Sequence, residues 1–170
     1  VLATMWLERR EVVKGRNEQR RQILFGIGVI AFFASIPYFY DGMVSGADLT
    51  YHLHRIEGVK DGLLTGQFPV RLEPRWVFDH GYANGIFYCN LLLYFPALLR
   101  MAGFTMTESY AFYCIGLNIA TAAIAWYCFN GIFGDRIIGL VCSALYTLSI
   151  FRFFKLVMVG AVGAVSYTHL

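Results

Sequence analysis

The sequence predicts an all-α, multipass helical membrane protein. Of its 170 residues, 58% are hydrophobic and only 15% are charged, whereas a soluble domain carries roughly 25% charged residues. Many apolar residues stand in long blocks, and about 20 such residues suffice for a helix to cross the hydrocarbon core. Basic residues gather before the first block, as is typical of a short cytoplasmic segment. These observations predict a protein of the cell membrane with its N-terminus in the cytoplasm.

Residues 1–22 are predicted to form a basic cytoplasmic tail. Six of the 14 Lys and Arg residues lie in this tail, interspersed with three acidic residues. The acidic residues also suit a charged helix, and a helical tail is compatible with the cytoplasmic location. The net charge of +3 does not predict nucleic-acid binding, because the excess lies beside an apolar block. Membrane lipid is therefore an expected partner, and nucleic acid is not.

Residues 23–40 are predicted to form the first transmembrane helix. The block contains no charged residue, and its eighteen residues give about 27 Å of helix. Tyr38 and Tyr40 suit the aromatic belt at the edge of a bilayer. With the tail in the cytoplasm, this helix carries the chain outward.

Residues 41–106 are predicted to form an external loop with amphipathic and juxtamembrane helices. Within it, residues 46–88 hold five of the 11 acidic residues and three of the four histidines. Apolar residues at helical spacing predict an amphipathic helix over 49–65, with Asp48 as its N-cap. Glycine and proline make the stretch after this helix irregular.

Further transmembrane helices are predicted within residues 107–165. The apolar segments from residue 86 onward are 86–101, 108–130 and 137–151, and only the second is long enough by itself to predict a crossing. Asn118 lies in the middle of that segment, so we expect its side chain to bond to a neighbouring helix.

The topology of these segments stays open. If 86–101 crosses the membrane, Arg100 lies inside. If that segment instead lies along the outer surface, 137–151 brings Arg152 to the outer face. So few charges are involved that the positive-inside pattern barely separates the two topologies.

The cysteines and the chain ends suggest little chemistry. The four cysteines lie in apolar segments without Cys-x-x-Cys spacing, which indicates packing rather than metal or redox chemistry. The chain opens at Val1, and residues 166–170 resemble translated read-through of a sequencing adapter. We therefore expect the N-terminal fragment of a longer protein, followed by a non-native tail.

Asp48 is the residue whose position best suits a catalytic role. It follows the first membrane helix closely, so its carboxylate would lie within reach of a lipid headgroup. A carboxylate there could accept a proton from an attacking hydroxyl if its pKa were raised above about 3.9. An N-cap that accepts a backbone N–H bond is an equally weighted alternative.

Several cations could hold an anionic phosphate beside Asp48. His52 and Arg55 follow Asp48 at i+4 and i+7 and so share a helix face, and charge-assisted hydrogen bonds to phosphate are strong. Snorkelling of Arg55 to lipid headgroups is the alternative, and Arg71 allows the same two interpretations. Glu57 and Glu73 are expected to be solvated. The metal requirement and any cofactor are unknown; a divalent metal is compatible with the sequence, and nothing indicates a nucleotide cofactor.

Three runs of the polar stretch together form a motif. They comprise Gly46, Asp48, Tyr51, His52, Arg55, Ile56, Glu57 and Gly58, then the run from Gly66 to Arg71, then Gly81, Tyr82, Gly85, Phe87 and Tyr88. This motif resembles the start of a bacterial multipass family, the 6-pyruvoyl-tetrahydropterin synthase-related membrane proteins. This family is similar to YfhO-type proteins, and both resemble the GT-C class of membrane glycosyltransferases. The resemblance does not imply pterin chemistry.

The resemblance implies a GT-C-like fold and transfer of a sugar from a polyprenyl-phosphate donor to an acceptor on the outer face of the membrane. It places Asp48 in the catalytic position of the first external loop. It also favours the topology in which 86–101 is juxtamembrane. The implied substrate-binding residues are His52, Arg55, Glu57, Arg71, Tyr88 and Arg152. A transporter or flippase subunit for lipid-linked glycans, or a non-catalytic membrane protein, is the alternative.

Overall fold

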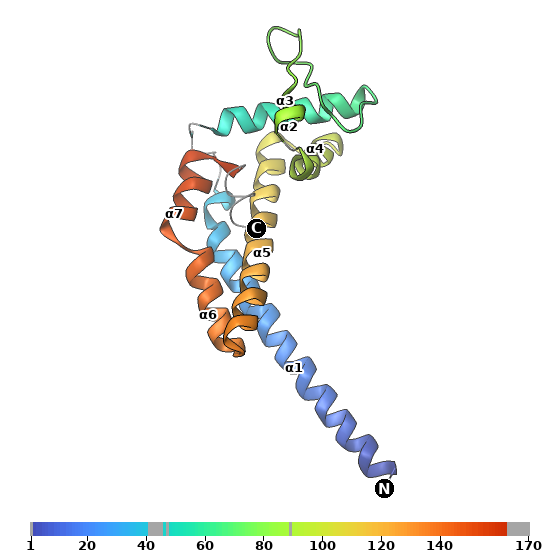
Figure 1. Ribbon diagram of the computed structural model, residues 1–170, viewed down its shortest axis with the longest axis vertical. Helices are drawn as coiled ribbons and strands as arrows, with labels where there is room; N and C mark the ends of the chain where they lie inside the picture. Colours follow the sequence, from blue (N-terminus) through green and yellow to red (C-terminus); the bar gives the residue numbers. More distant parts are fainter. Residues whose placement is uncertain (1, 41–45, 47, 89, 163–170) are drawn as a thin grey trace.

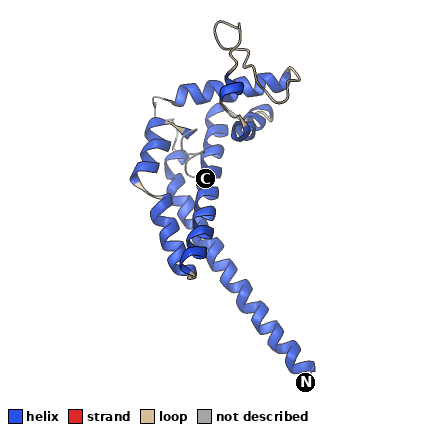
Figure 2. Cartoon of the chain, viewed as in Figure 1, coloured by secondary structure: helices blue, strands red, loops and turns tan. Residues whose placement is uncertain are grey.

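The computed structural model describes residues 2–40, 46, 48–88 and 90–162, which form an elongated, all-helical molecule (Figures 1 and 2). Long helices run side by side along its axis. A layer of shorter helices and loops covers one end of this bundle, and the first helix projects as a single rod from the other (Figure 1). Within the described residues the only β pairing is an isolated bridge between Glu73 and Tyr82.

Helix α1 (Leu2–Ser35) includes both the basic tail and most of the first apolar block. No proline interrupts these residues, so a single helix forms across both. The block ends in a 3₁₀ turn, η1 (Ile36–Phe39), with Pro37 near its start. The part from Asn17 to Phe39 is 23 residues long and apolar enough to cross a membrane.

Helix α5 (Met106–Phe133) is the second helix long and apolar enough to cross. Its first turn is stabilised by a capping box, in which Thr105 and Glu108 satisfy each other's backbone N–H groups. It ends at Gly134, whose φ of 66° is the left-handed conformation that glycine adopts readily. The predicted segment 108–130 is therefore helical throughout.

A bent helix pair packs against α5. Helix α6 (Arg136–Thr147) begins at Asp135, whose carboxylate accepts hydrogen bonds from two backbone N–H groups. The short helix α7 (Ile150–Phe153) and a π-helix, η3 (Phe154–Val159), continue in a direction bent by 44°. The described chain therefore has two candidate spans, or three if the bent pair crosses as one.

The segment 86–101 does not form a single helix. It is divided into α3 (Asn84–Phe87), a 3₁₀ turn η2 (Leu91–Leu93) and α4 (Tyr94–Met101). The apolar helix from Leu91 to Met101 falls in the class of shorter helices rather than candidate spans.

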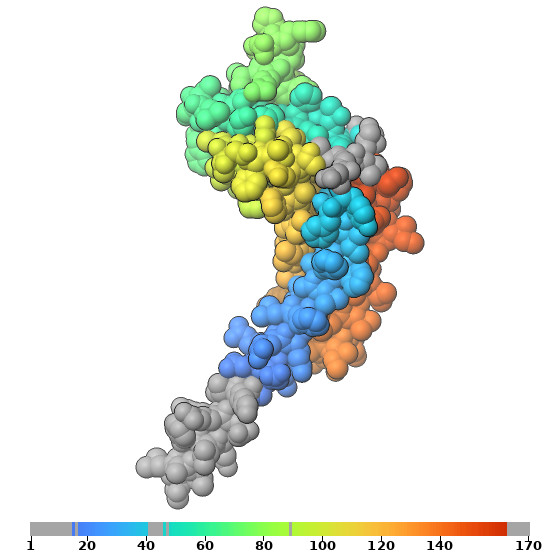
Figure 3. Space-filling model, turned by 180° about the vertical axis from the view of Figure 1, so that it is seen from behind, coloured from blue at the N-terminus to red at the C-terminus, as the bar shows by residue number. Residues whose placement is uncertain are grey.

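Helix α2 (Leu49–Leu64) confirms the predicted amphipathic helix and lies across the end of the bundle (Figure 1). It packs on α4, and in the space-filling view these two helices form a layer above the long column (Figure 3). One apolar core joins this layer to α5. Its fully buried members include Ile56 and Val59 from α2, Ala97 from α4 and Cys114 from α5. We call α2, α3, η2, α4 and the loop between α2 and α3 the end layer.

Candidate functional site

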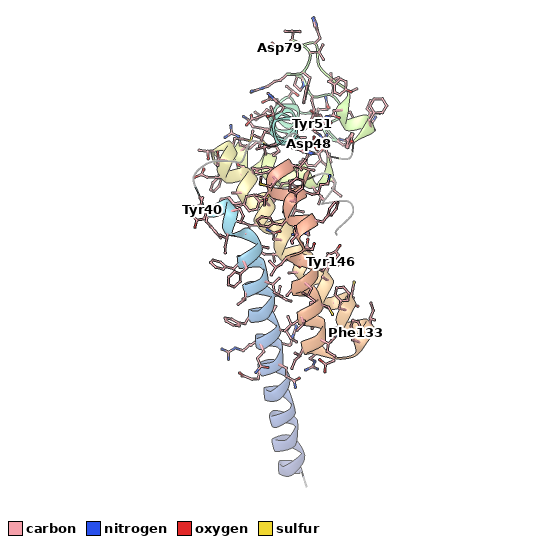
Figure 4. The ribbon with its side chains drawn as sticks, turned by 90° about the vertical axis from the view of Figure 1, so that its left-hand side faces the viewer. Tyr40, Asp48, Tyr51, Asp79, Phe133 and Tyr146 are labelled. Atoms are coloured by element: carbon pink, nitrogen blue, oxygen red, sulfur yellow. The ribbon has the colours of Figure 1, made fainter. Side chains whose placement is uncertain are left out.

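Asp48 lies where the end layer meets the bundle. Its backbone N–H donates to the carbonyl of Val159, the last residue of η3, at 3.0 Å. The Asp48 side chain is exposed and makes no capping bond to α2, so the N-cap role expected of its carboxylate is not seen. Figure 4 shows Asp48 and Tyr51 at the same end of the molecule, whereas Phe133 marks the opposite end of α5.

His52, one turn further along α2, is buried with 5% of its surface exposed. Burial, together with the nearby Arg55 charge, lowers the pKa of this imidazole to about 4, although the Asp48 charge partly opposes the shift. The imidazole is therefore neutral at pH 7. Its Nδ1 atom is buried without a hydrogen-bond partner among the described residues. His52 thus offers a neutral hydrogen-bonding group rather than a positive charge.

Arg55 is 1% exposed, and its guanidinium is held inside the end layer. It donates to Oδ1 of Asn90 at 2.6 Å and lies 3.9 Å from a carboxylate oxygen of Glu73. The rings of Tyr51 and Tyr88 flank it, with centroids 5.7 and 5.1 Å from the guanidinium carbon. These distances suit cation–π contacts. Arg55 therefore joins α2 to the chain that follows it.

Glu73 is the residue of the end layer whose surroundings differ most from those that the sequence predicts. We expected a solvated side chain, but Glu73 is fully buried. Its carboxylate accepts a hydrogen bond from Nε1 of Trp76 at 2.7 Å. Burial raises the pKa of Glu73, and the Trp76 bond and the Arg55 charge only partly oppose that rise. The expectation of solvation was wrong because the loop folds back over α2.

A close approach of two backbones makes this burial possible. A side chain at Gly58 of α2 would place its Cβ 2.9 Å from Cβ of Glu73. One turn later, a Cβ at Gly62 would lie 2.5 Å from a methyl carbon of Val70. Glycine at these two positions leaves room for the loop against α2. The pattern of glycines four apart on one helix is the signal that could have indicated the contact.

The other predicted substrate-binding residues occupy different surroundings. Glu57 accepts hydrogen bonds from Lys60 at 2.8 Å and from Arg100 of α4. Burial acts to raise the pKa of Glu57, but these two cationic partners outweigh it and lower the pKa. Arg71 is exposed on the loop after α2, and Tyr88 is half exposed beside Tyr51.

Arg152 lies inside the helix bundle and is 1% exposed. It donates to Oδ1 of Asn118 at 2.8 Å, to Oγ1 of Thr121 at 3.0 Å and to the carbonyl of Thr147 at 3.2 Å. Asn118 in turn donates to Ser35 of α1, so the expected interhelical bond of Asn118 is confirmed. These described hydrogen bonds link α7 to α5, α6 and α1.

The predicted site residues thus fall into separate groups. Asp48, His52, Arg55 and Tyr88 belong to the end layer and its junction with the bundle, whereas the described bonds of Arg152 lie within the bundle. Across the described residues, no group of three or more His, Cys, Asp or Glu side chains could hold a metal ion. The cofactor therefore stays unassigned.

Comparison of the chain with models of known protein families, with curated proteins and with solved structures gave no match. The family resemblance of the polar stretch accordingly remains a prediction from its motifs. The structure establishes a helical protein with two helices long and apolar enough to cross a membrane.

Proposed function

We propose that the protein is a membrane glycosyltransferase of the GT-C class that transfers a sugar from a polyprenyl-phosphate donor to an acceptor on the outer face of the membrane. The position of Asp48 is the observation that carries this proposal. Its exposed carboxylate lies at the junction between the end layer and the candidate membrane-crossing bundle, where a headgroup in the lipid and an acceptor in water can meet.

In this proposal Asp48 accepts the proton of the acceptor hydroxyl. The neutral imidazole of His52, one turn away, positions the hydroxyl or the carboxylate by hydrogen bonding. Arg71 is an exposed cation on the following loop, next to Val70, which packs against Gly62 about four turns along α2 from Asp48. In this proposal it binds an anionic part of the substrate away from the reacting hydroxyl by charge-assisted bonds. Arg55, with its internal contacts to Asn90 and Glu73, supports α2 and the loop rather than contacting substrate.

The test is sugar transfer by membranes that contain the longest gene product carrying this sequence. The donor is a labelled sugar on polyprenyl phosphate, and transfer is compared between the unchanged protein and its Asp48→Asn variant at matched amounts in the membrane. We expect Asp48→Asn to lower transfer by about 100-fold or more, the scale of general-base catalysis. Asp61→Asn, on the same helix but paired with Arg75, is the matched control. Undiminished transfer by Asp48→Asn would remove the catalytic role.

A second candidate is transport or flipping of lipid-linked glycans without chemistry. Arg152 favours it, because a buried cation within a bent, apolar helix pair is typical of a substrate pathway across a membrane. This function predicts that Asp48→Asn leaves translocation of a fluorescent lipid-linked glycan intact, whereas Arg152→Met abolishes it. The opposite result favours the transferase.

A further inference from the structure

A groove lies at the end of the bundle opposite Asp48. It has a volume of about 580 Å³ and is lined by residues of α1 (Gln19, Gln22 and Ile23) and of the α5–α6 turn and the start of α6 (Gly134 to Ile137, and Leu140). Figure 1 shows that α1 leaves the bundle at the level of this turn. The groove is therefore open to the surroundings between α1 and α6.

The depth of the groove matches one edge of the candidate spans. The candidate span of α1 begins at Asn17, its uncharged block begins at Ile23, and α5 ends at Phe133. Gln19 and Arg136 thus lie where both helices pass from apolar to polar sequence. Groups at this level of a membrane meet lipid headgroups rather than acyl chains.

The lining has a polar end and an apolar wall. Arg136 donates to the amide oxygen of Gln19, so its guanidinium is held across the groove between α6 and α1. Ile23, Ile137 and Leu140 form the apolar wall, and Ile137 remains 73% exposed. A phosphate group with attached hydrocarbon chains has this same division into polar and apolar parts.

The charges beside the groove favour an anion. Arg20 and Arg21 are exposed on α1 next to the lining residue Gln19, and they add to the charge of Arg136. The nearby acidic residues are Glu18 and Asp135. Oδ1 of Asp135 accepts hydrogen bonds from the backbone N–H groups of Ile137 and Ile138 in the first turn of α6.

We propose that this groove binds the headgroup of an anionic phospholipid, such as phosphatidylglycerol, in the leaflet that faces the basic tail. Arg136 binds the phosphate, Gln19 orients Arg136, and the acyl chains run along the wall formed by Ile23 and Leu140. Arg20 and Arg21 raise the local concentration of anionic lipid. The site lies at the opposite end of the bundle from Asp48 and does not depend on the proposed glycosyl transfer.

The test measures lipid retained by the purified chain in native mass spectrometry after extraction from vesicles. The vesicles contain either phosphatidylcholine alone or phosphatidylcholine with phosphatidylglycerol. We expect selective retention of phosphatidylglycerol, and we expect Arg136→Gln to lower it about fivefold, which corresponds to one cationic group at an anionic surface. The double variant Arg20→Gln with Arg21→Gln changes only exposed side chains and leaves the Arg136–Gln19 hydrogen bond in place. It is expected to lower retention as well, which would show that the loss in Arg136→Gln does not come from misfolding.

Arg75→Gln is the matched control, because it removes the same charge from the exposed loop of the end layer. Retention equal to that of the unchanged protein is expected for this control. Equal retention of both lipids, or equal losses in Arg136→Gln and Arg75→Gln, would overturn the site. Displacement of phosphatidylglycerol by inorganic phosphate at matched concentration would overturn the lipid assignment, because the groove would then bind soluble phosphate.

A second measurement locates the lipid without any substitution in the groove. Trp126 of α5 donates to the carbonyl of Arg136 at 3.4 Å, so its indole reports on this end of the bundle. In a variant with Trp6→Phe and Trp76→Phe, phosphatidylglycerol with brominated chains should quench the remaining fluorescence more strongly than brominated phosphatidylcholine. Equal quenching by the two lipids would count against the proposal.

Discussion

Two arginines, Arg55 in the end layer and Arg152 in the bundle, are buried to the same extent but are stabilised differently. Each is 1% exposed. Arg55 has a carboxylate, Glu73, and two aromatic rings around it. The described hydrogen bonds of Arg152 are with an amide, a hydroxyl and a backbone carbonyl, all of them neutral. The end layer thus stabilises its buried arginine with an ion pair, whereas the described part of the bundle stabilises its arginine with neutral hydrogen-bond acceptors.

The largest effect on the free energy of unfolding is expected at Glu73. Glu73→Ala leaves the Arg55 charge buried without its carboxylate, and removal of one partner of a buried pair costs about 3–5 kcal/mol. The measurement is the free energy of unfolding in detergent. Asp61→Ala, which breaks the exposed pair with Arg75, is the control, with an expected cost of about 0–1 kcal/mol. Equal costs for the two variants would show that the Arg55–Glu73 contact does not stabilise the end layer.

The second-largest effect is expected in how the free energy of unfolding depends on pH, because His52 of the end layer is buried. The pKa of His52 is about 4 in the folded protein and 6.5 in its ordinary state, so the unfolded chain binds more protons between these values. The contribution of His52 to the free energy of unfolding should therefore have its full value above pH 6.5 and decrease by about 2–3 kcal/mol as the pH falls to 4. Unfolding measured across this range checks the prediction.

His52→Gln should flatten the slope between pH 6.5 and 4. Glu57, whose pKa is lowered, contributes a separate loss of stability as the pH falls below its ordinary value of 4.5. Glu73, whose pKa is raised, acts with the opposite sign and loses stability as the pH rises above 4.5. The His52 contribution is therefore read from the difference between the unchanged protein and His52→Gln. A slope that persists in His52→Gln above pH 5 would assign the titration to another group.

A smaller effect is expected at the glycines where the loop meets α2. Gly62→Ala places a Cβ 2.5 Å from a methyl carbon of Val70, and overpacking of this kind costs about 1–3 kcal/mol. In α5 of the bundle, Gly131 has open space around it. Gly131→Ala should therefore be neutral or stabilise the protein by up to about 1 kcal/mol. Thermal unfolding of both variants gives the measurement, and an equal response would contradict the close packing of the end layer.

The smallest effect is expected at the second arginine. Arg152→Met removes a buried charge and leaves only neutral partners, and interhelical hydrogen bonds in membranes are worth about 0.6 kcal/mol on average. The free energy of unfolding should change by about 1 kcal/mol or less. A cost as large as that of Glu73→Ala would indicate that an anion pairs with Arg152 in the protein as it exists in the membrane.

Particular residues show how far the sequence alone can predict this protein. The period of apolar residues predicted α2 almost to its last residue, and the uncharged block predicted most of the first candidate span. Asn118 was recognised as a bonding residue because a lone amide in an apolar helix requires a partner. Glu73 was misjudged, because its burial depends on a loop that returns over Gly58 from fifteen positions away.

The hydropathy of the chain by itself determined where helices long enough to cross a membrane form, because helix formation and partition into hydrocarbon depend on neighbouring residues. It also determined that many of the acidic residues and histidines gather between the first of these helices and the second. Only the tertiary structure decided which charges meet: it paired Arg55 with Glu73, gave Arg152 neutral partners and formed the groove beside Arg136. Such pairings depend on close approach between distant segments, and electrostatic energies change steeply with distance and burial.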